Sequence, residues 1–195
     1  ALGMMGAVVL ASRSAARGRM LAAAGVSFIT DPADIDERAE EAAFGGGDPR
    51  DLAVHLATVK AATTAARNPA SVVIGADQTL DLDGRSMTKP ASPEDARRQL
   101  LALRGRSHRL HSAVACIGPA GTWRHVSSAT LTMRPFSEAF LDDYLASCGA
   151  RTLESVGGYH LEGHGIQLFH SVEGDFFTIL GLPMLPLLER LRQFG

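Results

Sequence analysis

The segment from Val72 to Pro90 constrains the fold more than any other part of this sequence. It begins with an apolar run that ends at an acid, Val72-Val73-Ile74-Gly75-Ala76-Asp77, and such a run is typical of a buried β-strand. Further on, the pair Asp83-Gly84 separates two short alternating segments. Asp-Gly is a strong signal for a two-residue hairpin turn, because glycine adopts a positive φ without steric cost. The segment therefore predicts a buried strand that continues into a hairpin.

The turn also predicts which residues of the hairpin face one another. Counting outward from it gives three opposed pairs: Leu82 with Arg85, Leu80 with Met87, and Gln78 with Lys89. Opposed residues have Cβ atoms about 5 Å apart, so we expect Lys89 to lie beside Asp77 and Gln78. A carboxylate and an ammonium group at the end of a buried strand indicate a site for phosphate and a metal ion. A slip of one residue would turn Lys89 to the other face of the sheet.

Lysine is rare in this chain. Of the 19 basic residues only two are lysines, Lys60 and Lys89, and the other 17 are arginines. Lysine supplies a compact point charge where arginine supplies a planar fork, so both lysines are candidates for a site that needs the former. Lys60 lies in a predicted helix that begins with Asp48 and Pro49 and reaches about Arg67. A lysine whose stem covers the core is the competing interpretation.

Strands and helices alternate along the rest of the chain, without repeats or linkers. We expect further strands at 7–11, 26–29, 107–117, 122–133 and 166–172. We expect further helices at 15–24, 93–103, 137–147 and 183–194. The acidic and then glycine-rich segment 31–48 predicts a mobile loop. This pattern is typical of an α/β or α+β protein with a mixed sheet, and the length suits a single domain over residues 1–195.

A second motif leads from the first strand into the first helix: Leu10-Ala11-Ser12-Arg13-Ser14-Ala15-Ala16-Arg17. The free amides of a helix N-terminus attract anions, and Ser12, Ser14 and Arg17 add two hydroxyl groups and a guanidinium group. These residues predict a cradle for a triphosphate. The glycines of a Walker loop are missing, and a serine cap followed by a solvated arginine would fit the same residues.

Two other motifs allow both a functional and an ordinary interpretation. The acidic run 34–37 could bind a divalent cation through Glu37 and its neighbours, or form a solvated loop. The four glycines of 157–165 disfavour a regular helix that would place His160 and His164 on a metal. They favour a bend in which Glu162 approaches a flat base, or else a wide surface loop. We expect no role for the histidines on strand-like segments, which are His108, His111, His125 and His170.

Composition excludes several classes of partner. The net charge of −2 and the pI of about 6.4 argue against binding to nucleic acid or to a membrane surface. No apolar run approaches the roughly 20 residues that span a bilayer, and the first residues lack the charged segment of a signal peptide. Cys116 and Cys148 have no paired spacing, which predicts a reducing, cytoplasmic location without structural zinc.

Taken together, these motifs resemble the Maf family of septum-formation-inhibitor-like nucleotide pyrophosphatases. The resemblance spans nearly the whole chain and keeps both order and spacing. It rests on Leu-Ala-Ser-x-Ser-x-x-Arg at 10–17, Lys60-Ala61, Ile74-Gly75-Ala76-Asp77, Lys89-Pro90, the run 103–108, Gly158-Tyr159 with Glu162-Gly163, and Gly181-Leu182-Pro183.

The resemblance implies a Maf/ITPase-like α/β fold, with a mixed twisted sheet, flanking helices and a deep cleft between two lobes. Family members are often dimeric, which allows a homodimer here. The implied activity is hydrolysis of a nucleoside triphosphate to the monophosphate and pyrophosphate, with Mg²⁺, Mn²⁺ or Co²⁺ as the cofactor.

The resemblance also implies roles for single residues. Asp77 would accept the proton of the attacking water and, together with Glu37, would contact the metal. The remaining catalytic positions are Lys60, Lys89 and Arg17, and the substrate-binding positions are Ser12, Ser14, Ala16, Gln78 and Glu162. The only two lysines of the chain occupy both lysine positions of the family.

The choice of base follows from a comparison of two branches of the family. The dTTP and UTP branch usually has Thr after the catalytic Asp, Gln in the Gly-Tyr segment and two arginines in the first motif. Gln78 and Glu162 resemble instead the 7-methyl-GTP branch, which commonly has Trp where this chain has Ala16. A carboxylate can accept the N1–H and 2-amino hydrogens of guanine, so we expect a modified purine such as 7-methyl-GTP. The alternatives are a dTTP/UTP pyrophosphatase and a regulator of cell division that senses a nucleotide by binding it.

Overall fold

The computed structural model describes residues 6–194. The first five residues, on which the absence of a signal peptide was predicted, lie outside this range, as does Gly195. Within it the chain forms one seven-stranded sheet in the order β2-β1-β3-β5-β6-β7, with β4 also paired to β3. The strands are β1 (Val8–Leu10), β2 (Ile29–Thr30), β3 (Val72–Leu82), β4 (Arg85–Met87), β5 (Ser107–Gly118), β6 (Gly121–Met133) and β7 (Phe169–Glu173).

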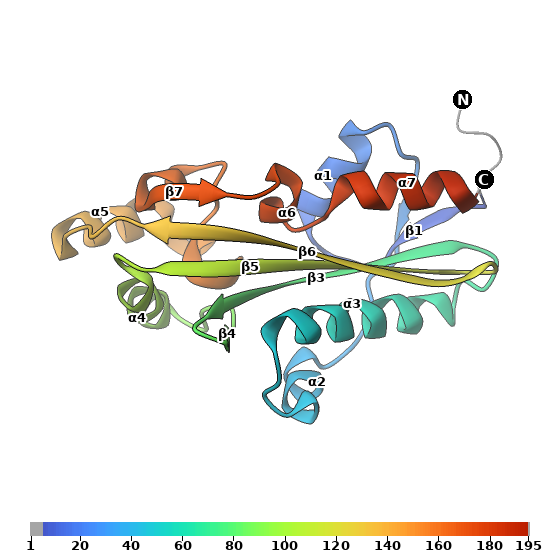
Figure 1. The fold of residues 1–195 in the computed structure, drawn as a ribbon, viewed down its shortest axis with the longest axis horizontal. Coiled ribbons are helices and arrows are strands. Elements are labelled where there is room, and N and C mark those ends of the chain that lie inside the picture. Colours follow the sequence, from blue (N-terminus) through green and yellow to red (C-terminus); the bar gives the residue numbers. More distant parts are fainter. Residues whose placement is uncertain (1–5, 195) are drawn as a thin grey trace.

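The sheet is mixed, as the sequence predicted. Strand β1 pairs in parallel with β2 and β3, and every other pair is antiparallel. The helices are α1 (Ala15–Ala23), α2 (Glu37–Phe44), α3 (Pro49–Ala65), α4 (Pro93–Leu103), α5 (Glu138–Cys148), α6 (Phe176–Leu180) and α7 (Met184–Phe194). Figure 1 shows α1, α6 and α7 on one side of the sheet and α2 and α3 on the other.

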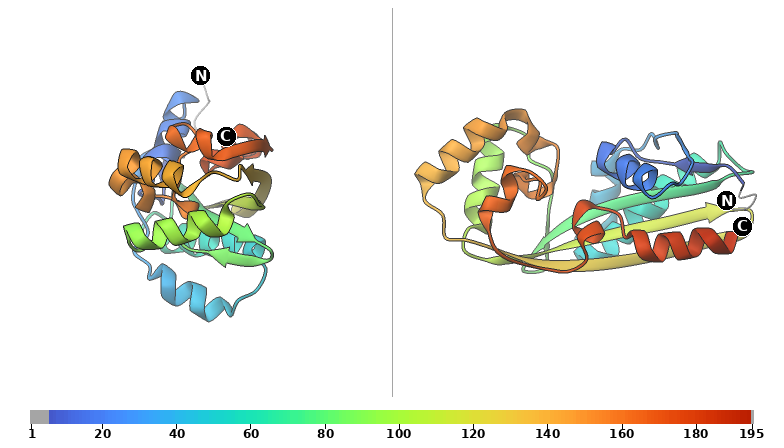
Figure 2. Two further views of the ribbon diagram at one scale, coloured as in Figure 1. Left: turned by 90° about the vertical axis from the view of Figure 1, so that its left-hand side faces the viewer. Right: turned by 90° about the horizontal axis from the view of Figure 1, so that it is seen from above.

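Two apolar cores lie towards opposite ends of the long strands. One contains Ile74 of β3 together with residues of α1 and α7, and the other contains Leu80 of β3 together with residues of α4 and α5. The second view in Figure 2 shows these two groups of helices at the two ends of the molecule, joined by β3, β5 and β6. This is the two-lobed arrangement that the resemblance implied.

The hairpin forms in the predicted register for its first two pairs. Leu82 faces Arg85 and Leu80 faces Met87, and both turn residues have positive φ, 53° at Asp83 and 82° at Gly84. The third predicted pair, Gln78 with Lys89, is wrong. Strand β4 ends at Met87, and the next carbonyl, that of Thr88, accepts a hydrogen bond from Gln99 of α4 instead.

The prediction of a mobile loop over 31–48 is also wrong for its second half, where α2 forms. Asp36 caps this helix, since its side chain accepts a hydrogen bond from the Ala39 amide, and Gly45 ends it in the left-handed conformation. Its first turn carries Glu37 and Glu40, which favour a helix N-terminus.

The C-terminal part differs from the prediction in detail. The expected strand 166–172 begins only at Phe169, because residues His164–Leu168 form a 3₁₀ helix. Two further 3₁₀ helices cover Gly149–Leu153 and Val156–Gly158, and the five-residue helix α6 was not expected. Among residues 6–194, no helix combines the length and the apolar character that crossing a bilayer requires.

Candidate active site

A cavity of about 370 Å³ lies between the two lobes, and the predicted site residues gather around it. It is lined by nine of the ten: Ser14, Ala16, Arg17, Glu37, Lys60, Asp77, Gln78, Lys89 and Glu162. The tenth, Ser12, is buried behind them, where its hydroxyl accepts hydrogen bonds from the Ser14 amide at 3.2 Å and from Arg17 Nη1 at 3.4 Å. Residues from α1, α2, α3 and β3 therefore meet at one place.

Lys60 joins two carboxylates in this cavity. Its Nζ atom lies 2.8 Å from Asp77 Oδ1 and 3.0 Å from Glu37 Oε1, and the Lys60 residue is only 9% exposed. Helix α3 can lie close to the sheet because small residues form their contact: Ala53, Ala57 and Ala61 of α3 pack against Ala113 and Ala115 of β5, the neighbour of β3. Of the two interpretations of Lys60, the structure therefore favours a charge that is paired inside the cavity over a side chain whose stem only covers the core.

Three of the carboxyl groups that line the cavity have shifted pKa values. Burial raises the pKa of Asp77 above its ordinary value, and Lys60 and Arg17 offset this only in part. Burial also raises the pKa of Glu37, but Lys60, Lys89 and Arg17 together outweigh it, so that the pKa is lowered overall. Glu41, which the sequence did not single out, has a raised pKa because it is partly buried and faces Asp77 and Glu37. Relative to its ordinary value, Asp77 is therefore shifted towards a stronger base, whereas Glu37 is shifted towards a stronger acid.

The first turn of α1 supplies a partly buried guanidinium group, that of Arg17. Ser14 caps the helix and accepts a hydrogen bond from the Arg17 amide at 3.3 Å, and Arg17 Nε donates to the Gly181 carbonyl at 2.8 Å. Burial lowers the pKa of Arg17, whereas Asp77 and Glu37 raise it; an arginine stays protonated under such shifts. The Leu-Ala-Ser-x-Ser-x-x-Arg motif thus places the Arg17 cation near Asp77 and Glu37, the two carboxylates that Lys60 joins.

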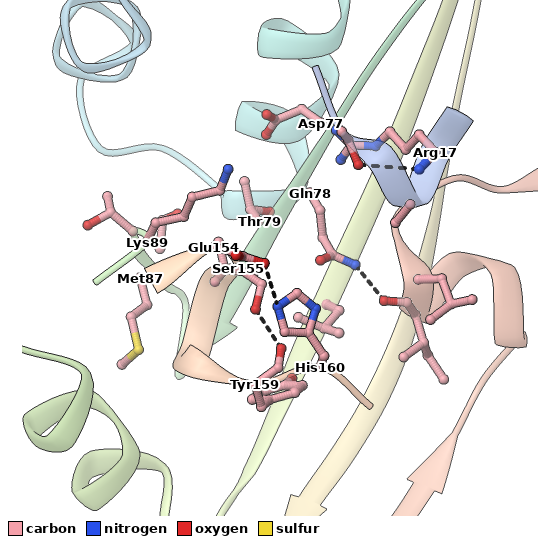
Figure 3. Close-up of a pocket in the computed structure, with 18 of the residues that line it drawn as sticks. Arg17, Asp77, Gln78, Thr79, Met87, Lys89, Glu154, Ser155, Tyr159 and His160 are labelled. Atoms are coloured by element: carbon pink, nitrogen blue, oxygen red, sulfur yellow. Dashed lines mark hydrogen bonds and ion pairs between the residues drawn. The ribbon is translucent and has the colours of Figure 1, made fainter. Parts of the chain in front are cut away.

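Gln78 uses its amide nitrogen to hold helix α6. Its Nε2 atom lies 3.1 Å from Ser112 Oγ, 3.2 Å from the Thr178 carbonyl and 3.0 Å from the Ile179 carbonyl. These three acceptors engage both hydrogens of the amide group. Figure 3 shows the Gln78 side chain in the middle of the cavity, reaching towards this helix end. Of the two polar atoms of the Gln78 side chain, the oxygen Oε1 is therefore the one available to contact a substrate.

The wall opposite Arg17 and Asp77 is acidic. His160 lies between two glutamates, with Nε2 at 3.6 Å from Glu154 Oε2 and Nδ1 at 3.7 Å from Glu162 Oε1. Figure 3 shows Glu154, Ser155, Tyr159 and His160 together on this wall. Sequence reasoning identified Glu162 but not Glu154, which precedes the glycine-rich segment and carries no motif of its own.

Two groups of side chains could bind a divalent cation. Asp77 and Glu37, the predicted pair, offer carboxylate oxygens of the kind that hard cations prefer, and both face the cavity. The second group is Asp48, Asp81 and His111, whose ligand atoms lie within 4.8 Å of one another. Here Asp81 already binds the Gly84 amide at 2.7 Å and His111 Nε2 at 2.9 Å. The second group therefore fits a structural role in the hairpin, although no role was expected for His111.

Comparison with known proteins agrees with this geometry. Residues 7–194 match the family described as "Maf-like protein". The chain is 49% identical over 191 residues to the 7-methyl-GTP pyrophosphatase of Rhizobium etli, covering 96% of both chains. It is 51% identical over 190 residues to the nucleoside triphosphate pyrophosphatase of Paramagnetospirillum magneticum, covering 96% of this chain and 98% of the relative.

A solved structure shows a weaker likeness. The Ham1 protein of Staphylococcus aureus shares 17% identity at a TM-score of 0.47, over 66% of this chain and 72% of that one. This score is too low to support a conclusion. The family match covers nearly the whole chain, and relatives at about half identity cover it equally well. The chain belongs to the Maf family.

Proposed function

We propose that this chain is a nucleoside triphosphate pyrophosphatase, which cleaves its substrate between the α- and β-phosphates. The observation that carries the proposal is one cavity that is lined by Arg17, Lys60 and Lys89 and in which Lys60 pairs with the buried carboxylate of Asp77. Three cations in one cavity suit a triphosphate, and a carboxylate among them suits the activation of water. The names of the relatives at 49–51% identity support the same reaction.

In this proposal Asp77 is the general base. A water molecule at Asp77 loses a proton to the carboxylate while its oxygen bonds to the α-phosphorus, and the bond from that phosphorus to the bridging oxygen breaks. Pyrophosphate then leaves with the bridging oxygen. The raised pKa of Asp77 strengthens it as a base. Arg17, Lys60 and Lys89 stabilise the charge on the phosphate oxygens.

A divalent cation fits the same cavity. Asp77 and Glu37 would hold it, and it would supply further stabilisation of negative charge on the phosphates. We expect Mg²⁺, Mn²⁺ or Co²⁺ to support activity. A cytoplasmic location and a homodimer remain predictions.

For the base we propose a modified purine, with 7-methyl-GTP as the reference substrate. The wall with Glu154 and Glu162 lines the cavity across from Arg17, so a base bound there would meet negative charge. A 7-methylated guanine carries a positive charge and offers N–H donors to a carboxylate. A UTP or dTTP pyrophosphatase remains the second candidate, because uracil also presents an N–H group to a carboxylate.

Pyrophosphate release from a panel of triphosphates tests the proposal: GTP, 7-methyl-GTP, UTP, dTTP and 5-methyl-UTP, each with Mg²⁺, Mn²⁺ and Co²⁺. We expect the highest kcat/KM for 7-methyl-GTP and a loss of about 100-fold or more in kcat for Asp77→Asn. Asp143→Asn, on the exposed surface of α5, is the matched control and should keep full activity. Tight nucleotide binding without pyrophosphate release under any metal would contradict the proposal and favour a nucleotide sensor.

A further inference from the structure

A second hollow lies on the face formed by α1, α6 and α7. It has a volume of about 410 Å³. Its walls are mostly apolar and include Met20, Phe176, Phe177, Met184, Leu185 and Leu188. Two of these side chains are unusually exposed for their type, Phe176 at 58% and Leu185 at 69%. We call this hollow the apolar groove.

The apolar groove adjoins the candidate active site. Ala16, Leu180 and Glu162 line both the groove and the cavity that holds Asp77. Ala16 contributes only a methyl group to this border, so little side-chain volume separates the two spaces. The border lies next to the acidic wall rather than next to Lys60, because Glu162 is part of it. A nucleotide with its phosphates at Arg17 and Lys60 and its base at Glu162 would therefore point the outer edge of the base at the groove.

The lining of the groove indicates what would enter it. The rings of Phe176 and Phe177 pack edge to face, with an interplanar angle of 77° and centroids 5.5 Å apart, and such faces and edges pack well against a further aromatic ring. The carboxylate of Glu162 at the entrance favours a base that carries a positive charge. The groove shares a border with the substrate cavity, and this continuity favours a part of the substrate over a second copy of the chain as its occupant.

We propose that the apolar groove binds an apolar or aromatic group attached to the base of the nucleotide. The substrate class is then nucleoside triphosphates whose base carries a bulky alkyl or aryl group, in particular on a ring nitrogen that becomes cationic. This inference rests on the proposed function, since it assumes that a nucleotide occupies the cavity. It goes beyond that function because a methyl group would not reach into the groove.

Pyrophosphate release from 7-methyl-GTP and 7-benzyl-GTP tests the inference. Burial of the phenyl ring in the groove should make KM for 7-benzyl-GTP lower than for 7-methyl-GTP by about tenfold. Leu185→Glu places a charge in the groove and should reduce the ratio of kcat/KM for the benzyl substrate to that for the methyl substrate by a similar factor, about tenfold. Ile166→Glu changes another exposed apolar residue, outside the groove, and should leave this ratio unchanged.

Equal changes for both substrates in Leu185→Glu, or exclusion of 7-benzyl-GTP by the wild-type enzyme, would overturn the inference. A dimer that Leu185→Glu dissociates in sedimentation, with unchanged benzyl preference, would also overturn it and identify the groove as a contact between copies. Binding of 7-(4-fluorobenzyl)-GTP, followed by ¹⁹F NMR, separates this question from the proposed function. If no triphosphate is hydrolysed, a fluorine signal that shifts in wild type and not in Leu185→Glu still supports the groove, and an unshifted signal refutes it.

Discussion

Gly75 lies directly against Ala57, so closely that a Cβ atom on Gly75 would stand 2.2 Å from the Ala57 carbonyl oxygen and 2.6 Å from the Ala61 amide nitrogen. This contact lets α3 rest on β3 and brings Lys60 to Asp77. We expect Gly75→Ala to push the helix away and to destabilise the protein by about 1–3 kcal/mol or more. Urea unfolding measures the loss, and kcat should fall as well because Lys60 moves.

Gly18→Ala is the matched control for this substitution. Gly18 lies inside α1, and the nearest atom to a Cβ there is a carbon of Phe28 at 3.8 Å. We expect this variant to be more stable by about 0.5–1 kcal/mol, because alanine favours the helix. If Gly75→Ala were as stable as Gly18→Ala, the close approach of α3 to β3 would be wrong.

Glu37→Gln should weaken the binding of the divalent cation. Removing one carboxylate charge from the pair with Asp77 should raise the metal concentration for half-maximal rate by about tenfold or more. Titration of activity with Mg²⁺ measures this. Glu40→Gln is the control, because Glu40 lies on the same helix but binds His55. An unchanged requirement in Glu37→Gln and a raised one in Asp48→Asn would move the metal to the group around His111.

Gln78→Glu should disturb substrate binding through helix α6. The new carboxylate would face the Thr178 and Ile179 carbonyls, which lose their donor, and such a loss costs about 1–3 kcal/mol. Displacement of the helix end would move Gly181, the anchor of Arg17, so we expect a higher KM. Steady-state kinetics and urea unfolding together check this. Gln167→Glu, on the exposed surface, should change neither quantity.

His108 should make stability depend on pH. Burial lowers the pKa of His108 to about 4, and its Nε2 shares a hydrogen bond of 2.7 Å with the Tyr159 hydroxyl. Between pH 6.5 and pH 4 the unfolded chain binds a proton here and the folded chain does not, so stability falls as the pH is lowered. The loss amounts to about 3 kcal/mol over this range. Urea unfolding from pH 7 to pH 4 should show a weaker pH dependence in His108→Gln, whereas the exposed control His170→Gln should keep that of wild type.

The parts of the fold that could be predicted depend on neighbours in sequence. The turn at Asp83-Gly84 and the cap at Asp48 need only a few adjacent residues. Helix α2 departs from the prediction because the glycines that follow it are typical of a loop, and the hydrogen bond by which Asp36 caps the helix is seen only in the structure. The predicted pairing of Gln78 with Lys89 is wrong because the chain leaves the sheet at Thr88. The Thr88 carbonyl accepts a hydrogen bond from Gln99, which lies eleven residues further along the chain.

The candidate site likewise has parts that short sequence motifs predict and parts that depend on residues far apart in the sequence. Single motifs pointed to Arg17, Lys60 and Asp77, but the bridge from Asp77 through Lys60 to Glu37 depends on the packing of α3. The apolar groove could not be predicted from the sequence, because it forms only where α1 meets helices that lie more than 150 residues further along the chain.

The parallel pairing of β1 has a consequence for the order in which the protein is made. Val8–Leu10 pairs in parallel with Val72–Ile74, so the strand that leads to Ser12 and Arg17 has its main partner more than 60 residues downstream. To form this pairing, the chain must first lose the conformational entropy of the long loop between the two strands, and the stabilising contacts form only afterwards. During synthesis the first strand leaves the ribosome well before its partner. The segment that contains Ser12 and Arg17 is thus translated well before its β3 partner, and we expect it to become ordered only after β3 has been translated.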